Sequence, residues 1–122
     1  MAMHESGEMY LETIYVLSKK NKDVRAIDIA TELNYSKPSV SVALANLKKE
    51  KYIMTDPKGY ISLTDEGKAI ATKIYSRHTS LSDFFISIGV DKDIAVEDAC
   101  RIEHVISDET MDKINAFVKN SK

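Results

Sequence analysis

The residues with the clearest chemical potential are Cys100, Glu103 and His104, which stand close together in the last quarter of the chain. If this segment is helical, their spacing of three and four residues places a thiol, a carboxylate and an imidazole on one face. These groups are ligands of first-row divalent metals. Three ligands leave a metal incompletely coordinated, so other helices must supply the rest. A metal held between helices can set their relative position, which indicates a switch.

The same three residues allow two other interpretations. A free cysteine is commonly a small buried apolar residue, and Glu and His at this spacing are common on exposed helix faces. Cys100 could also be the nucleophile of an enzyme, with His104 or His78 as its base. Neither an oxyanion-hole loop nor a strand-to-helix elbow surrounds Cys100, so we predict that the protein is not an enzyme.

The composition is that of an ordinary globular protein. The chain has 122 residues, of which 43% are hydrophobic and 30% are charged, enough for one domain or two small ones. The single cysteine excludes an intrachain disulfide framework and suits the reducing cytoplasm. No apolar run approaches the length of a membrane-spanning helix, so we expect no membrane association.

The net charge of −2 is unevenly distributed. Residues 1–64 carry nine Lys/Arg and eight Asp/Glu, whereas residues 65–122 carry eight and eleven. A nearly neutral first part and an acidic second part fit a DNA-reading end joined to a cation-binding end.

Residues 1–64 follow the pattern of a winged helix-turn-helix. Apolar periodicity predicts helices over 8–20 and 26–33, and a third helix follows a turn at residues 34–35. Ser36 is suited to cap that third helix, with Pro38 in its first turn. Residues 52–55 and 60–63 read as two strands, joined by the turn sequence Asp-Pro-Lys-Gly.

The start of the third helix suits contact with DNA. Small hydroxyl side chains and lysines allow close approach to phosphates and base edges in the major groove, and the hairpin tip would reach a phosphate or the minor groove. The predicted DNA-binding residues are Ser36, Lys37, Pro38, Ser39, Ser41 and Lys58. The alternative is a winged helix used only for protein contacts.

Residues 65–122 are predicted to form a helical second domain, which makes the fold mainly α. Thr64 is suited to cap a long helix that runs to about residue 88 and ends at Gly89. Further helices are predicted over 91–106 and from Ser107 or Asp108 to about residue 118. Apolar residues of this part are candidates for core or dimer contacts: Phe84, Phe85, Ile86, Ile88, Val96, Val105 and Ile106.

Three segments carry a resemblance to a known family. Residues 8–15 (EMYLETIY), 99–104 (ACRIEH) and 107–109 (SDE) look like the diphtheria toxin repressor family, and the similarity extends over about residues 5–118. That family includes iron-dependent repressors and manganese transport regulators. The resemblance implies a homodimeric DNA-binding repressor that needs a divalent metal. It also implies a winged-helix domain followed by a helical metal-binding and dimerisation domain.

The resemblance also implies a set of metal ligands. The iron branch uses the residues that match Met9, Cys100, Glu103 and His104. The manganese branch has an acidic residue at the first of these positions and a glutamate at the second, and also uses the residues that match Glu12 and His78. The chain thus combines ligands of both branches, and the six could hold one metal or two that share Glu103.

Two departures from the family pattern stand out. The iron branch has an ancillary site with an acidic residue and a histidine at the positions of Ser82 and Val96, so that site is not expected in its usual form. Asp83 is adjacent but would point in another direction on the helix. The C-terminal SH3-like domain of the longer iron repressors is not expected either, because the length resembles that of the two-domain manganese regulators.

The donor set suggests which metals bind. Thioether and thiolate are soft ligands, whereas carboxylate and imidazole accept Mn(II) or Fe(II), so the expected cofactor is Fe(II) or Mn(II). Co(II), Ni(II) and Zn(II) are expected to substitute in vitro. The expected partners are a second copy of the chain and a palindromic double-stranded DNA operator. The alternative function is a metal-independent winged-helix regulator that responds to another ligand.

Overall fold

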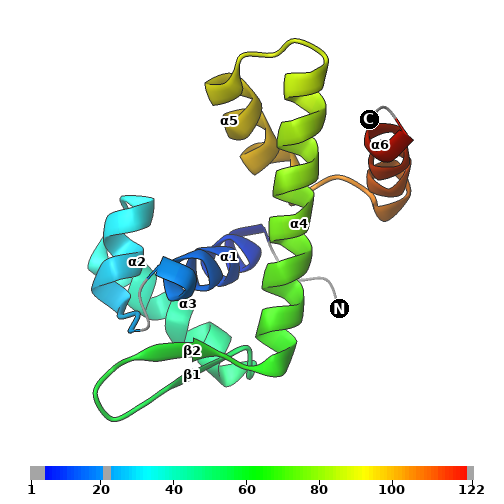
Figure 1. Ribbon diagram of the computed structural model, residues 1–122. Helices are drawn as coiled ribbons and strands as arrows, with labels where there is room; N and C mark the ends of the chain where they lie inside the picture. The colour runs from blue at the N-terminus through cyan, green and yellow to red at the C-terminus, as the bar shows by residue number, and fades with distance from the viewer. Residues whose placement is uncertain (1–4, 21–22, 121–122) are drawn as a thin grey trace. The chain divides into compact units, whose positions relative to one another are not determined.

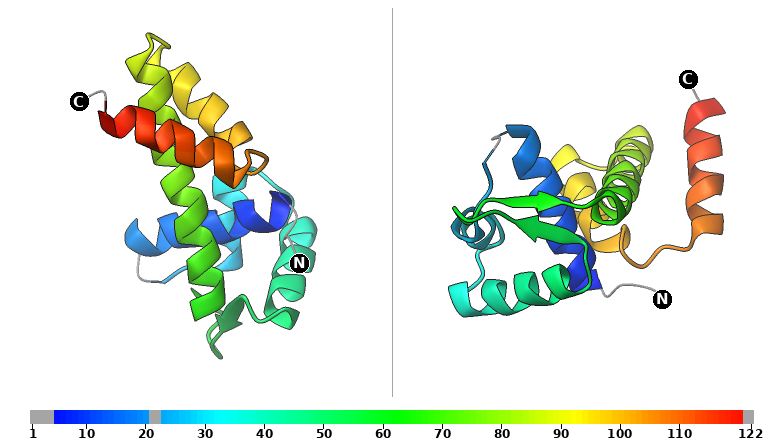
Figure 2. Two further views of the ribbon diagram at one scale, coloured as in Figure 1. Left: turned by 90° about the vertical axis from the view of Figure 1, so that its right-hand side faces the viewer. Right: turned by 90° about the horizontal axis from the view of Figure 1, so that it is seen from below.

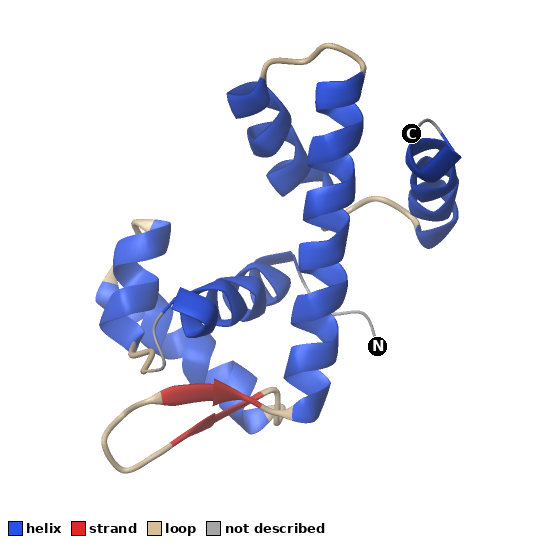
Figure 3. Ribbon diagram, viewed as in Figure 1, coloured by secondary structure: helices blue, strands red, loops and turns tan. Residues whose placement is uncertain are grey.

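The computed structural model describes residues 5–20 and 23–120 and is mainly helical, with a single small sheet in the described part of the chain (Figures 1 and 3). Two compact units, Met1–Thr72 and Lys73–Lys122, divide the chain within α4. The elements in chain order are α1 (Glu5–Lys20), α2 (Ala26–Leu33), α3 (Lys37–Lys49), β1 (Ile53–Thr55), β2 (Ile61–Leu63), α4 (Asp65–Ser87), α5 (Lys92–Ile102) and α6 (Asp108–Asn120). The predicted mainly α fold with a winged helix-turn-helix is confirmed.

The first unit consists of three helices, a β-hairpin and the first turns of α4. Helices α2 and α3 pack against each other and against α1, while β1 lies beside α3 and β2 beside α1 (Figure 2). Apolar residues from all of these elements form one core, with Leu11, Ile14, Ile29, Val40 and Ile53 among its most buried positions. This packing leaves the outer face of α3 in solvent.

The start of α3 is as the sequence predicts. Ser36 is the N-cap, and its hydroxyl accepts a hydrogen bond from the backbone N–H of Ser39 at 3.3 Å. Pro38 lies in the first turn, where its missing N–H leaves no helical hydrogen bond unmade. Val40, Leu44 and Leu47 are buried, which fixes the rotation of the helix about its axis.

The hairpin is antiparallel, and both strands are shorter than predicted. Ile53 pairs with Leu63, and Thr55 pairs with Ile61. In the turn, the Asp56 carboxylate accepts hydrogen bonds from the backbone N–H groups of Lys58 and Tyr60, both at 2.9 Å. Tyr52 lies outside β1 because its N–H donates to Leu47 and its carbonyl accepts from Thr64, so both groups are used to anchor the base of the hairpin.

Gly67 allows α4 to begin directly against that anchor. A Cβ atom at this position would lie 2.0 Å from the carbonyl oxygen of Tyr52, which no side chain can tolerate. Thr64 caps the helix as predicted, since its hydroxyl oxygen accepts from the Gly67 N–H at 3.1 Å and its O–H donates to the Lys51 carbonyl. The wing and the first turns of α4 are therefore tightly joined.

The second unit contains the remainder of α4 together with α5 and α6. Its small core centres on Leu81, Ala99 and Met111. Helix α4 ends at Ser87, and Gly89 follows with a φ of 102°, the left-handed conformation in which glycine is most easily accommodated. The hydroxyl of Ser107 accepts from the Thr110 N–H at 3.1 Å and so caps α6.

The predicted end of the fifth helix at Ile106 is wrong. Helix α5 ends at Ile102, and Glu103 is its C-cap with helical angles (φ −56°, ψ −25°). Val105 and Ile106 both donate to the carbonyl of Ile102, so the chain tightens into a turn there. No helix in the part of the chain that is described has the length and apolar character needed to cross a membrane.

Candidate metal centre and nucleic-acid interface

The side chains of His78, Glu103 and His104 meet in the second unit. Glu103 is completely buried, and its Oε2 lies 2.9 Å from Nδ1 of His78, which α4 contributes. The other carboxylate oxygen, Oε1, lies 3.3 Å from Nε2 of His104. The His104 side chain is only 3% exposed and that of His78 is 24% exposed. The centre is thus a buried carboxylate between two imidazoles.

This arrangement fits a divalent metal. An ionised carboxylate is costly to bury unless charges or hydrogen bonds compensate it. Imidazole nitrogen and carboxylate oxygen are ligands that Fe(II) and Mn(II) accept. Two donors that bind one ion at about 2.1 Å and at right angles stand about 3 Å apart. The two nitrogen–oxygen distances are close to this value, so the side chains are compatible with a common ion.

Arg77 holds the turn that carries Glu103 and His104. Its Nη1 donates to the backbone carbonyls of Glu103 at 3.1 Å and of Ile106 at 3.0 Å, and its Nη2 donates to the Asp108 carboxylate. Hydrogen bonds from Lys73 and from Arg77 hold the pKa of Asp108 below its ordinary value. One side chain of α4 therefore joins the end of α5 to the start of α6.

The other predicted ligands lie in two places. Cys100 is half-buried in α5, one helical turn before Glu103. Met9 and Glu12 are half-buried on α1 in the first unit. The sulfur of Met9 accepts a hydrogen bond from the Tyr35 hydroxyl, with 3.5 Å between the two atoms. The six predicted ligands are therefore divided, two in the first unit and four in the second.

The positions of the ancillary site hold no charged side chain. Ser82 is buried, and its hydroxyl has no hydrogen-bond partner among the described residues. Val96 is partly exposed on α5, and Asp83 is exposed on α4.

The predicted DNA-binding residues all lie at the surface of the first unit. Five of them occupy the cap and the first turns of α3, and Lys58 lies at the tip of the hairpin. Arg25 was not among the predicted residues. It stands immediately before α2, exposed, with its guanidinium carbon 4.6 Å from the centre of the Tyr60 ring. The sequence feature that could have drawn attention to Arg25 is its position as a basic residue directly before the second predicted helix.

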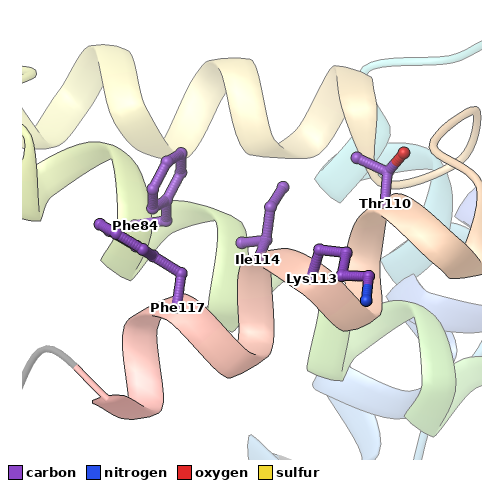
Figure 4. Close-up of a pocket in the computed structure, with 5 residues that line it drawn as sticks. All are labelled: Phe84, Thr110, Lys113, Ile114 and Phe117. Atoms are coloured by element: carbon purple, nitrogen blue, oxygen red, sulfur yellow. The ribbon is translucent and has the colours of Figure 1, made fainter.

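Apolar side chains of the second unit are partly exposed. A shallow hollow between α4 and α6 is lined by Phe84, Ile114 and Phe117, with Thr110 and Lys113 beside them (Figure 4). The rings of Phe84 and Phe117 meet edge to face, with centroids 5.8 Å apart. Ile86, Ile88, Val96 and Val105 are exposed as well. Phe85 and Ile106 instead pack against the core, so the predicted apolar cluster has two different environments.

Comparison with known proteins identifies the two domains of the chain. Residues 2–61 match the N-terminal DNA-binding domain of iron-dependent repressors, and residues 64–122 match their metal-binding and dimerisation domain. A transcriptional regulator of the helix-turn-helix type from Methanocaldococcus jannaschii, itself uncharacterised, is 32% identical over 98% of both chains.

Solved structures show the same fold. The manganese regulator SloR is 27% identical over 93% of this chain and superposes with a TM-score of 0.82. A manganese-dependent transcriptional repressor in complex with manganese is 24% identical over 93% of this chain, with a TM-score of 0.86. The chain spans only 53% and 52% of these two proteins. The matched domains are those of transcriptional regulators and not of enzymes. The chain therefore belongs to the iron-dependent repressor family, to which the regulators related to the diphtheria toxin repressor belong.

Proposed function

We propose that this protein is a repressor of transcription that binds DNA when it holds Fe(II) or Mn(II), and that it controls genes of metal homeostasis. The observation that carries the proposal is the buried Glu103 carboxylate, in contact with the imidazoles of His78 and His104. It lies within the region that matches a metal-binding and dimerisation domain.

The proposed ligands are Met9, Glu12, His78, Cys100, Glu103 and His104. A divalent ion supplies the positive charge that this set of carboxylates and thiolate requires. Met9 and Glu12 belong to the first unit, so coordination by all six would connect the DNA-binding unit to the dimerisation unit. Binding requires a deprotonated Cys100 and neutral imidazole nitrogens at the two histidines.

The proposed ligands differ in the metals that they prefer. Met9 and Cys100 offer soft sulfur donors, which favour Fe(II) over Mn(II). The carboxylates of Glu12 and Glu103 and the imidazole of His78 accept Mn(II). The similar manganese-dependent repressor holds manganese, as its name states, and this keeps Mn(II) as the second candidate. Co(II), Ni(II) and Zn(II) should bind in vitro because they stand later in the affinity order.

Residues of α3 and of the hairpin are proposed to contact the operator. Lys37 and Lys58 suit phosphates, while Ser36, Pro38, Ser39 and Ser41 are small enough for close approach to the groove. Arg25, next to the hairpin, suits a further phosphate. In a homodimer two such units would read a palindromic site, with half-sites about one helical turn apart.

The apolar surface of the second unit supports the homodimer. Ile86, Ile88, Val105 and Phe117 are exposed, with relative exposures of 42%, 60%, 63% and 57%. A second copy would cover such a surface and hold two recognition helices at a set distance. With the units free to move, the spacing would match DNA only part of the time, which lowers the apparent affinity by that fraction. We place this activity in the cytoplasm, where the operator would be.

The test is anaerobic binding to the DNA upstream of its own gene, titrated with Fe(II) and with Mn(II) at fixed salt. We expect DNA binding that appears with metal and disappears with a chelator, and the midpoints rank the two metals. Glu103→Ala should abolish this dependence while the fold is retained. The matched control is Glu97→Ala, because Glu97 is exposed on α5, the helix that Glu103 caps, and pairs only with Arg101 at 2.6 Å among the contacts described for it.

Tight DNA binding that ignores both metals and the chelator would contradict the proposal. It would favour a metal-independent winged-helix regulator, with the stretch from Cys100 to His104 as ordinary packing.

A further inference from the structure

The outer face of α3 has an unusual composition for an exposed helix. Opposite the buried stripe of Val40, Leu44 and Leu47, the helical period brings Pro38, Val42, Ala45 and Lys49 into one line. Every residue of that line is exposed. Charged residues occur only at the two ends of the helix, and its exposed centre is neutral and small.

Val42 stands at the middle of this face. It is 63% exposed, more than Ile27 (46%), Tyr35 (43%) or Met54 (52%), the other large exposed apolar residues described in the first unit. A single exposed apolar side chain is ordinary on a protein surface. Val42 differs because its position opposite the core puts it where a recognition helix comes closest to the base edges.

The chemistry of the major groove restricts what Val42 can contact favourably. Each base pair presents hydrogen-bond donors and acceptors there, and the one apolar group is the C5-methyl of thymine. Over any other base edge, Val42 would cover a polar atom without offering a hydrogen bond, which costs free energy. A β-branched side chain on a helix also has a nearly fixed χ1 angle, so its methyl groups are already positioned.

The flanking residues support the same orientation. Lys37 at the start of α3 and Lys48 and Lys49 at its end can reach the phosphates on both sides of a groove. Asn46, exposed beside Val42, is a side chain that pairs with adenine through two hydrogen bonds. Thymine and adenine are partners in one base pair, so both residues favour A·T pairs.

We infer that Val42 is a specificity-determining residue of this protein and that it reads the methyl group of one thymine in each operator half-site. The inference rests on the proposed function, because it requires a protein that binds DNA through α3. It adds a base preference to the contacts with phosphates and groove walls proposed above.

The experiment starts with selection of the tightest duplexes from a random library by the 122-residue protein, loaded anaerobically with Fe(II) and, in a parallel selection, with Mn(II). Each thymine of the selected half-site is then replaced by deoxyuridine, which removes only the methyl group. For the wild-type protein, one position should lose about fourfold in affinity, the effect of burying one methyl group. For Val42→Ala that same replacement should have no effect.

Two controls test whether a lost response to deoxyuridine is specific to Val42 and is not caused by unfolding. Met54→Ala removes another exposed apolar side chain of the same unit and should keep the full response to deoxyuridine. Thermal unfolding of Val42→Ala should match that of the wild type, because an exposed side chain contributes little to the core.

Two results would overturn the inference while leaving the proposed function intact. One is metal-dependent binding in which no thymine responds to loss of its methyl group. The other is an equal response in the wild type and in Val42→Ala. If the wild type selects no duplex with either Fe(II) or Mn(II), the proposed function fails and the inference about Val42 fails with it.

Discussion

Glu103 is a carboxylate without exposed surface, and the free energy of keeping it buried depends on the groups around it. Two imidazole nitrogens lie within 2.9 and 3.3 Å of its oxygens. An imidazole can donate a hydrogen bond to the carboxylate or can turn the same nitrogen toward a metal. His78 thus forms a hydrogen bond with Glu103, and the same nitrogen could instead serve as a metal ligand, as the proposed metal-dependent function requires.

Ser82, unlike Glu103, is a buried polar residue with no polar group described close to its side chain. Its hydroxyl has no hydrogen-bond partner in the described part of the chain, and burial of such a group costs about 1–3 kcal/mol. We expect Ser82→Ala to increase the free energy of unfolding by about 1 kcal/mol. The melting temperature should then rise by about 3–5 °C in a thermal unfolding experiment.

Ser76→Ala is the control for Ser82→Ala. Ser76 is exposed on the same helix, so its replacement changes only the helix propensity, by about 0.5 kcal/mol or less. A loss of stability in Ser82→Ala would show that the hydroxyl has a partner in solution, and the prediction would be wrong.

At the scale of elements, the end of α5 and the start of α6 are held by one residue of α4. The guanidinium of Arg77 reaches two backbone carbonyls and the Asp108 carboxylate, and its side chain is only 11% exposed. Carbonyls at the end of a helix lack partners within the helix, so Arg77 satisfies groups that would otherwise need water. His78 follows Arg77 directly, and Glu103 is one of the residues whose carbonyl is bound.

Arg77 should therefore position the metal ligands without touching the metal. We expect Arg77→Met to lower the affinity for Mn(II) by about 10- to 100-fold, the usual effect of losing a residue that orients ligands. Isothermal titration or a competing chelator measures this directly, without DNA. Arg77→Lys should restore little, because one ammonium cannot reproduce the planar fork of donors.

Lys73→Met is the matched control, since Lys73 pairs with the same Asp108 at 3.2 Å but is 60% exposed. It should leave the Mn(II) affinity within about twofold, because exposed ion pairs contribute little. Equal effects of the two variants would mean that only the charge near Asp108 matters. Because the pKa of Asp108 is lowered, its carboxylate is ionised at every pH above its ordinary pKa. Its pairs with Lys73 and Arg77 are therefore lost only as the pH falls through the lowered value.

At the scale of the whole molecule, the proposed ligands come from both units, so binding and stability are linked. A metal that binds only the folded chain raises the free energy of unfolding by about 2.7 kcal/mol at a concentration of 100 times Kd. We expect Mn(II) to raise the melting temperature of the wild type at pH 7.5 and to raise it less at about pH 5.5. The sign follows because protons compete for Cys100, His78 and His104, and metal binding releases them.

Glu103→Ala should lose the increase in melting temperature, and excess chelator should reverse it in the wild type. An equal increase in Glu103→Ala would place the metal elsewhere. An increase that is larger at low pH would contradict the assignment of the thiol and the two imidazoles as ligands.

Much of the first unit could be predicted from the sequence, because its signals are local. The cap at Ser36, the early Pro38 and the turn after Thr55 each depend on a few adjacent residues, and each is observed. The family resemblance is equally local in origin, since it rests on short motifs. The strand ends were less predictable, because Tyr52 uses its backbone groups to bind Leu47 and Thr64, a choice that adjacent residues do not reveal.

Sequence alone determined the residue types of the proposed centre and the spacing of Cys100, Glu103 and His104. Only the tertiary structure decided that α5 ends at Ile102, that Arg77 binds the following turn, and that His78 meets Glu103 across 25 positions of sequence. It also separated Phe85, which packs in the core, from the exposed Ile86 and Ile88. The physical reason is the same in each case: helix periodicity is encoded locally, whereas a helix end and a buried contact depend on side chains that only folding brings near.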